Sequence, residues 1–329
     1  RFTGTRTTRF HNWTAGKIYE LIIKKERRGD YLGKTVQVIP HVTDEIKNAF
    51  YSVAGNYDIV IVEIGGTVGD IESQPFLEAV RQMRLSLGSE NTLFVHLTLV
   101  PFIGTSGELK TKPTQHSVKE LRSIGIQPDI LLCRADRKLP PELKAKVALF
   151  TNVPLEAVIT ALDAESIYDV PLNLAQEGLD YIILKKLNLK PKTPDLDSWK
   201  ELASRYKKPD GEVNIALIGK YVGLHDSYLS LYQALEHGGL ANNLRVNLDW
   251  IEAEVLEQGE PARILKSKDG ILVPGGFGRR GIEGKIKAVT YARQKGVPFF
   301  GICLGMQCAT VEFARNVARL KKAHSEEFD

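Results

Sequence analysis

Residues 297–307 read Val-Pro-Phe-Phe-Gly-Ile-Cys-Leu-Gly-Met-Gln, and this stretch decides the fold of the second half of the chain. The apolar residues predict a strand, and a helix-like stretch follows Cys303. A cysteine between two glycines, at a strand-to-helix turn, is the pattern of a nucleophile elbow with Cys in place of Ser. The N-terminus of the following helix favours a thiolate and offers N–H groups to a developing oxyanion. The stretch therefore predicts thiol-based acyl transfer on an α/β fold.

Strands and helices alternate on both sides of a polar stretch. Strands are expected at 36–40, 57–63, 92–99, 129–133, 213–218, 246–250, 270–273 and 298–301, and helices at 14–25, 75–87, 114–124, 226–235 and 284–294. This alternation predicts two doubly wound, mostly parallel α/β domains. Residues 188–211 are rich in Pro and Lys, which indicates a linker between a domain at 1–187 and one at 212–329.

The bulk composition excludes several classes of protein. The chain has 329 residues, 43% hydrophobic and 26% charged, which indicates globular domains, and its net charge of +4 does not suggest a nucleic-acid partner. No apolar run approaches a membrane span, so no membrane partner is expected. Three cysteines are too few for a disulfide framework, which favours a cytoplasmic location. The chain starts without Met and stops soon after a helix pattern, so we expect an interior fragment in which both domains are truncated.

A glycine-rich loop follows the strand at 270–273. The sequence from Pro274 to Gly278 is Pro-Gly-Gly-Phe-Gly, which is either an ordinary flexible loop or a source of backbone N–H donors for an oxyanion. The cysteine elbow favours the second interpretation. Cys303 is the expected nucleophile, whereas Cys308 fits a small buried core residue.

An acidic, glycine-rich loop in the first half runs from Glu63 to Ser73, Glu-Ile-Gly-Gly-Thr-Val-Gly-Asp-Ile-Glu-Ser. Ligands of open α/β sheets bind at the carboxyl ends of the strands, where this loop is expected. Its carboxylates Glu63, Asp70 and Glu72 repel one another unless a cation or a donor-rich ligand is present. The loop is therefore either a Mg²⁺ and nucleotide site or a solvated acidic loop.

A basic helix start follows at Lys110-Thr-Lys-Pro-Thr-Gln-His116. Two lysines, two hydroxyls and a helix N-terminus suit phosphate groups, although ordinary helix capping is an alternative. Lys146 lies beside an apolar run and indicates nothing by itself.

The glycine loop and the cysteine stretch together resemble the class I glutamine amidotransferases. The resemblance implies that Cys303 attacks the side-chain amide of glutamine and releases ammonia. It also implies a glutamine pocket formed by Gly276, Leu304, Gly305, Met306, Gln307 and Glu327. The His and Glu of that family's triad lie beyond the last residue of this chain, and none of His225, His237 and His324 is assigned as the base.

The acidic loop, the Lys110 stretch and three earlier segments (4–19, 25–33 and 36–41) closely resemble the CTP synthase family. This resemblance implies a P-loop-like amidoligase domain and the ATP-dependent amination of UTP to CTP with ammonia from glutamine. It assigns Glu63 to Mg²⁺. It assigns Asp70, Ile71, Glu72, Lys110, Thr111, Lys112, Pro113, Thr114, Gln115 and Lys146 to UTP or CTP, and Arg134, Leu162, Asp163 and Ala164 to ATP.

The family resemblance further implies a cytoplasmic homotetramer and GTP as an allosteric activator. One departure is that the chain contains no G-x-x-x-x-G-K-[ST] phosphate loop, so we expect the chain alone to be inactive. Two alternatives stay open. One is another class I amidotransferase, such as a GMP synthetase or a cobyric-acid-type amidase, and the other is a nucleotide-binding filament subunit without turnover.

Overall fold

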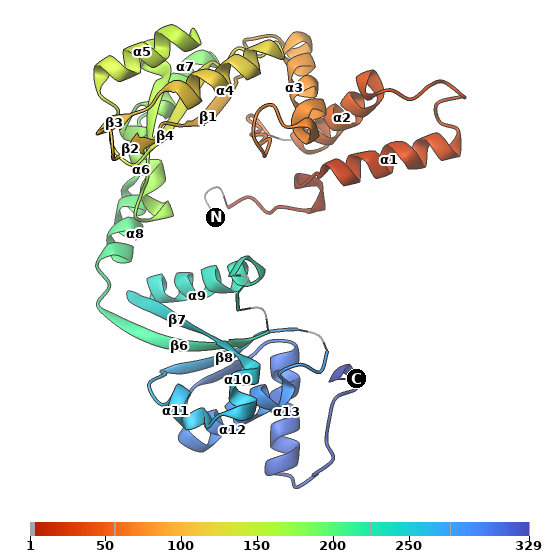
Figure 1. Ribbon diagram of the computed structural model, residues 1–329, viewed down its shortest axis with the longest axis vertical. Helices are drawn as coiled ribbons and strands as arrows, with labels where there is room; N and C mark the ends of the chain where they lie inside the picture. Colours follow the sequence, from red (N-terminus) through yellow and green to blue (C-terminus); the bar gives the residue numbers. More distant parts are fainter. Residues whose placement is uncertain (1–3, 56, 221, 224, 277, 329) are drawn as a thin grey trace. The chain divides into compact units, whose positions relative to one another are not determined.

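Two units make up the chain in the computed structural model, Arg1–Leu196 and Asp197–Asp329 (Figure 1). The structure describes residues 4–55, 57–220, 222–223, 225–276 and 278–328. Each unit contains a parallel sheet with helices packed against it, which confirms the predicted α/β class. None of the helices in these ranges is long and apolar enough to cross a membrane.

The first unit is built around a three-stranded parallel sheet in the order β1-β4-β5, with a small antiparallel pair β2-β3. Its strands are β1 (Val95–Leu99), β2 (Phe102–Ile103), β3 (Glu108–Leu109), β4 (Ile130–Ala135) and β5 (Val158–Leu162). Its helices are α1 (Ala15–Arg28), α2 (Thr43–Ala54), α3 (Gln74–Leu87), α4 (Lys112–Ser123), α5 (Pro141–Thr151), α6 (Val170–Gln176) and α7 (Leu179–Lys186). The core of this sheet joins β4 and β5 to α4 and α5 through buried residues such as Leu131, Ile159, Val118 and Val147.

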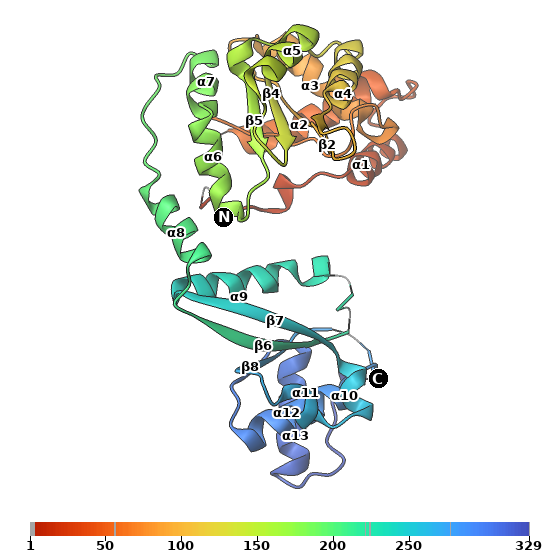
Figure 2. The same cartoon turned by 60° about the vertical axis from the view of Figure 1, so that its left-hand side comes forward.

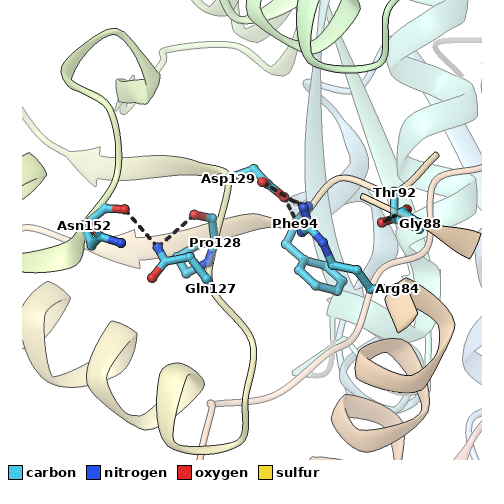
Figure 3. Close-up of polar contacts among 8 residues, drawn as sticks. All are labelled: Arg84, Gly88, Thr92, Phe94, Gln127, Pro128, Asp129 and Asn152. Atoms are coloured by element: carbon cyan, nitrogen blue, oxygen red, sulfur yellow. Dashed lines mark hydrogen bonds and ion pairs between the residues drawn. The ribbon is translucent and has the colours of Figure 1, made fainter. Parts of the chain in front are cut away.

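A polar cluster fixes the amino ends of β1 and β4 (Figure 3). The Asp129 carboxylate accepts hydrogen bonds from both terminal nitrogens of Arg84, at 2.6 and 3.1 Å, and from the backbone N–H of Phe94 at 2.8 Å. The Arg84 guanidinium also lies 4.7 Å from the centre of the Phe94 ring. One carboxylate therefore connects the end of α3 with the entries of two strands, which sets their parallel register.

Two predicted strands of the first unit are wrong. Residues 57–63 form no strand in the described structure, and Ile61 is 89% exposed. The β-branched run predicts a strand only where a neighbour supplies hydrogen bonds, and this segment pairs with none of the described strands. Residues 36–40 instead lead into a helical turn, Val38–Val42, because Pro40 has no N–H to donate to a ladder and its carbonyl accepts from the Thr43 hydroxyl.

The second unit has a four-stranded parallel sheet in the order β7-β6-β8-β9. Its strands are β6 (Gly211–Gly219), β7 (Leu244–Glu252), β8 (Gly270–Val273) and β9 (Phe299–Gly301). Its helices are α8 (Asp197–Lys207), α9 (Leu229–Ala241), α10 (Ala253–Gln258), α11 (Pro261–Leu265), α12 (Ile282–Lys295) and α13 (Leu304–Asn316). All four predicted strands are confirmed, and the helix expected at 226–235 begins later, at Leu229, after a short three-ten turn.

Helices cover both faces of this sheet. Helix α9 lies along β7, on the side opposite α10, α11 and α12 (Figure 2). Strands β8 and β9 end level with each other, because Val273 pairs with Gly301. The loop after β8 and the turn after β9 therefore leave the same edge of the sheet side by side.

Candidate functional site

Cys303 occupies the turn between β9 and α13 and is exposed. Its backbone has φ 52° and ψ −110°, a conformation that a non-glycine residue rarely adopts. The backbone N–H of Ile302 donates to the Val273 carbonyl at 2.9 Å, which fastens the turn to β8. The predicted strand–cysteine–helix turn is confirmed.

The two glycines that bracket this turn are required by close backbone packing. A Cβ on Gly301 would lie 2.5 Å from the carbonyl carbon of Gly305. A Cβ on Gly305 would lie 2.0 Å from the Val273 carbonyl oxygen. Real Cβ atoms do not approach backbone so closely, so only glycine allows the helix to start against the end of β8.

The glycine loop after β8 lies directly beside Cys303. A Cβ placed on Gly275 would be 3.4 Å from Cys303 Cβ and 3.9 Å from its Sγ. A Cβ on Gly276 would lie 3.7 Å from Lys220 Cδ, 3.7 Å from Lys285 Nζ and 3.9 Å from Leu304 Cδ2. The structure therefore brings the two motifs of the second half together, although Phe277 lies outside the described residues.

The residues expected to bind glutamine meet along the first turns of α13. Gln307 donates its side-chain amide to the Glu327 carboxylate and accepts a hydrogen bond from the Ser325 hydroxyl at 3.1 Å. Two contacts of the next residue hold the segment that carries Glu327. The Phe328 side chain is buried, and the Phe328 carbonyl accepts a hydrogen bond from Arg279 at 3.0 Å. Leu304 and Gly305 are buried, and Met306 is exposed.

No hydrogen bond joins a histidine to Cys303 among the described side chains. His237 and His324 are both exposed, and the His324 ring lies 3.3 Å from the carbonyl of Ser325. The side chain of His225 falls outside the part of the chain that the structure describes. The base that activates the thiol is therefore not assigned.

Sequence reasoning missed two buried lysines behind the glycine loop, Lys220 and Lys285. Lys220 follows β6, is 3% exposed and donates its amine to the Gly278 carbonyl. Lys285 is fully buried in α12, and its Nζ has no hydrogen-bond partner among the described residues. The signal for Lys285 was its position between Ile282 and Ile286 on the apolar face of a predicted helix.

Burial changes the protonation of Lys285 and of its neighbour Cys308. Removal from water is the main cause that lowers the pKa of Lys285 to about 8; Cys308 opposes this shift, and the positive charge of Lys220 adds a smaller lowering effect. Burial raises the pKa of the Cys308 thiol to about 11. At pH 7 the pair is therefore an ammonium beside a neutral thiol, with no ion pair to offset the burial of the charge.

We expect Lys285→Met to stabilise the protein at neutral pH. The pKa of this lysine is 10.5 in the unfolded chain and about 8 in the folded one. Below pH 8 the folded protein therefore carries a buried positive charge that lowers its stability. This penalty, about 3 kcal/mol, is full below pH 8 and vanishes as the pH rises through 10.5. Urea unfolding at pH 7 and pH 10.5 measures it, and the variant should gain stability only at pH 7. Lys295→Met, at the exposed end of the same helix, is the control; an equal gain at both pH values would contradict the argument.

In the first unit, the acidic loop does not gather its carboxylates around one point. Glu63, Asp70 and Glu72 are exposed, and Asp70 Oδ2 accepts the backbone N–H of Thr67 at 3.1 Å. The described residues contain no group of three His, Cys, Asp or Glu side chains that could hold a metal ion. The assignment of Glu63 to Mg²⁺ therefore stays a prediction, and Asp70 stabilises the turn of its own loop. Ile71 is exposed beside them.

The residues from Lys110 to Gln115 divide into two groups. Thr111 and Thr114 are buried, and Thr114 donates to the Leu99 carbonyl at 3.2 Å, which connects the start of α4 to the end of β1. Gln115 donates to the Thr111 hydroxyl at 3.2 Å, and Lys112 and Pro113 open α4 at the surface.

Lys110 and Lys146 approach the same carboxylate. Lys110 bonds Glu108 at 2.6 Å, and this bond is the main cause of the lowered pKa of Glu108. Lys146, exposed on α5, lowers the same pKa more weakly through its charge. The structure therefore brings together two lysines that lie far apart in the sequence.

Arg134 and Asp163 also meet, at the ends of β4 and β5. Arg134 Nε donates to Asp163 Oδ1 at 2.8 Å, and the Asp163 N–H donates to the Ala135 carbonyl at 2.9 Å. Leu162 closes β5, and Ala164 follows the acid. The pair is half-exposed, so it leaves polar atoms for a ligand at this edge of the sheet.

Comparison with known proteins covers both units. The family described as CTP synthase N-terminus matches residues 1–189, and the family described as Glutamine amidotransferase class-I matches residues 224–327. A CTP synthase of Acidobacterium capsulatum is 63% identical over 329 residues, and one of Koribacter versatilis is 62% identical over 331 residues.

These alignments cover 100% of this chain but only 60% and 59% of the two relatives, so the chain spans less than two thirds of their length. A solved structure of the Trypanosoma brucei CTPS glutaminase domain with bound acivicin is 43% identical, covers 36% of this chain and 46% of its own, and has a TM-score of 0.34. Because the first family matches more than half of the chain and the second follows it in order, the chain belongs to the CTP synthase family.

Proposed function

We propose that this chain takes part in the ATP-dependent amination of UTP to CTP, with ammonia released from glutamine at Cys303. The observation that carries the proposal is the identity of 63% to a CTP synthase over all 329 residues, including both units. The exposed Cys303 beside Gly275 supports the glutaminase half.

The glutaminase half would work by covalent catalysis. The Cys303 sulfur forms a bond to the amide carbon of glutamine, and the carbonyl electron pair moves to oxygen. Backbone N–H groups of the glycine loop at Gly276 would stabilise this oxyanion. Its collapse expels ammonia, which requires a proton, and water then hydrolyses the thioester to glutamate. Gln307 and Glu327, with Leu304, Gly305 and Met306 beside them, would hold the substrate.

The synthetase half would bind two nucleotides. The lysines Lys110, Lys112 and Lys146 carry the charge needed for the phosphates of UTP or CTP. The remaining contacts to that nucleotide would come from Asp70, Ile71, Glu72, Thr111, Pro113, Thr114 and Gln115. The Arg134–Asp163 pair, with Leu162 and Ala164, would contact ATP. ATP phosphorylates the 4-oxygen of UTP, and ammonia displaces the phosphate.

Mg²⁺ would be held by Glu63 together with nucleotide phosphates. Mg²⁺ usually takes only one or two carboxylates from the protein, so a single exposed acid fits this mode better than an all-protein cage. When bound, the ion offsets negative charge on the phosphates.

The organisation that goes with this function is a synthetase domain at 1–187, a linker at 188–211 and an amidotransferase domain at 212–329. We further propose a cytoplasmic homotetramer that GTP activates. Size measurement with UTP and ATP present tests the assembly.

The function is tested with a chimera in which the Acidobacterium capsulatum relative supplies the length that this chain does not span. With ATP, UTP and glutamine we expect CTP, measured by chromatography. Replacing UTP with XMP should give no amination. Amination of XMP would favour another amidotransferase, and assembly with nucleotides without CTP formation would favour a filament subunit.

A further inference from the structure

Lys285 is a buried charge that the proposed reaction leaves unused. Its side chain is fully buried, and its Nζ lacks a hydrogen-bond partner among the described residues. An ammonium group buried without a partner is costly, so such a group commonly marks a functional site.

The Gly275–Gly276 dipeptide separates this charge from the nucleophile. The Cβ position of Gly275 lies 3.9 Å from Cys303 Sγ, and the Cβ position of Gly276 lies 3.7 Å from Lys285 Nζ. Two consecutive backbone positions thus face the thiol and the ammonium group in turn. Neither glycine has a side chain, and the described side chains nearest the Cβ position of Gly276, besides Lys285, are those of Lys220 and Leu304.

The groups around Lys285 leave its charge uncompensated. Cys308, from α13, is a neutral thiol at pH 7 because burial raises its pKa to about 11. Lys220, at the end of β6, carries the same sign. Glu254 of α10 approaches Arg280 at 3.3 Å. The electrostatic field of the ammonium group at the glycine loop is therefore only weakly reduced by neighbouring charges or by water.

We propose that Lys285 is a positioning residue whose buried charge, acting across Gly276, makes the space beside Cys303 favourable for a negatively charged oxygen. Its value for glutamine hydrolysis rests on the proposed function, because the oxyanion of that reaction forms in this space. The effect of the Lys285 charge on negatively charged groups beside Cys303 does not depend on the proposed function. The buried charge of Lys285 would lower the stability of the fold. It would also keep the space beside Cys303 favourable for a negative charge before any substrate binds.

The test compares alkylation of Cys303 by iodoacetate, an anion, and by neutral iodoacetamide, using this chain itself. Cys133 and Cys308 are buried, so the reaction of the folded chain reports on Cys303. Both reagents react with the thiolate form of Cys303. The ratio of the two rates therefore does not depend on the fraction of the thiol that is ionised. At pH 7 we expect Lys285→Met and Lys285→Gln to lower this ratio roughly tenfold, the effect of one unit charge at a separation of about 12 Å and an effective dielectric constant of about 20.

Two further measurements make the result decisive. Lys295→Met, the same change at the exposed end of α12, should leave the ratio unchanged. The wild-type ratio should fall as the pH rises through about 8, and the Lys285→Met ratio should not. Equal ratios in the wild type and both Lys285 variants at pH 7 would overturn the proposal. A fall in the ratio, with no glutamine hydrolysis by the chimera, would keep the Lys285 proposal and refute the proposed function.

Discussion

Cys303→Ala in the chimera should abolish CTP synthesis from glutamine and leave synthesis from ammonia within about twofold of the wild type. The loss should be at least roughly 1,000-fold, because no other group can form the thioester. Ammonia added to the solution bypasses this step, and the residues proposed to bind the nucleotides belong to the other unit. Initial rates of CTP formation with each nitrogen donor measure both effects.

Cys308→Ala is the matched control, since this cysteine lies on the same helix but is buried in the core. It should keep both activities, at a cost in stability of about 1 kcal/mol. Loss of both activities in Cys303→Ala would contradict the assignment of separate sites for glutamine and for the nucleotide.

Gly305→Ala should destabilise the second unit by about 3 kcal/mol or more. The added methyl group would meet the Val273 carbonyl oxygen at 2.0 Å, and that overlap is with backbone rather than with a flexible side chain. Either β8 or the start of α13 must move. Chemical unfolding, with hydrogen exchange of the α13 amides, measures the loss.

Gly238→Ala provides the contrast. Gly238 lies inside α9, and a Cβ there meets no heavy atom within 4 Å. Alanine is a better helix former than glycine by about 1 kcal/mol, so this variant should be slightly stabilised. A loss of less than about 1 kcal/mol in Gly305→Ala would show that the turn can relax around the methyl group.

The second unit was predictable because its strands are apolar runs that find neighbours within the unit. The run at 57–63 has the same composition, yet it forms no strand. Composition measures how well a segment suits a sheet, whereas a strand also needs a partner for its N–H and C=O groups. No property of the run itself shows whether that partner exists.

The sequence predicts the geometry around Cys303 in the second unit more completely than the geometry of the expected nucleotide site in the first. The Cys303 turn is local, so its sequence contains most of its geometry. In the first unit, the resemblance assigns Thr114 to a nucleotide, and the structure shows that its hydroxyl donates to the Leu99 carbonyl. Sequence identifies a hydroxyl at a helix start, but the tertiary contact decides whether it faces a ligand or β1. Lys285 was missed because lysines are usually exposed.

The carbonyl of Val273 is a common contact for the segments around Cys303 in the second unit. It receives the N–H of Ile302 at 2.9 Å, it is the surface against which Gly305 rests, and the glycine loop departs from the same residue. A movement of β8 and β9 as one unit would therefore carry the Cys303 sulfur and the glycine loop together. We therefore expect the spacing between the sulfur and the loop to change little when the whole sheet edge shifts.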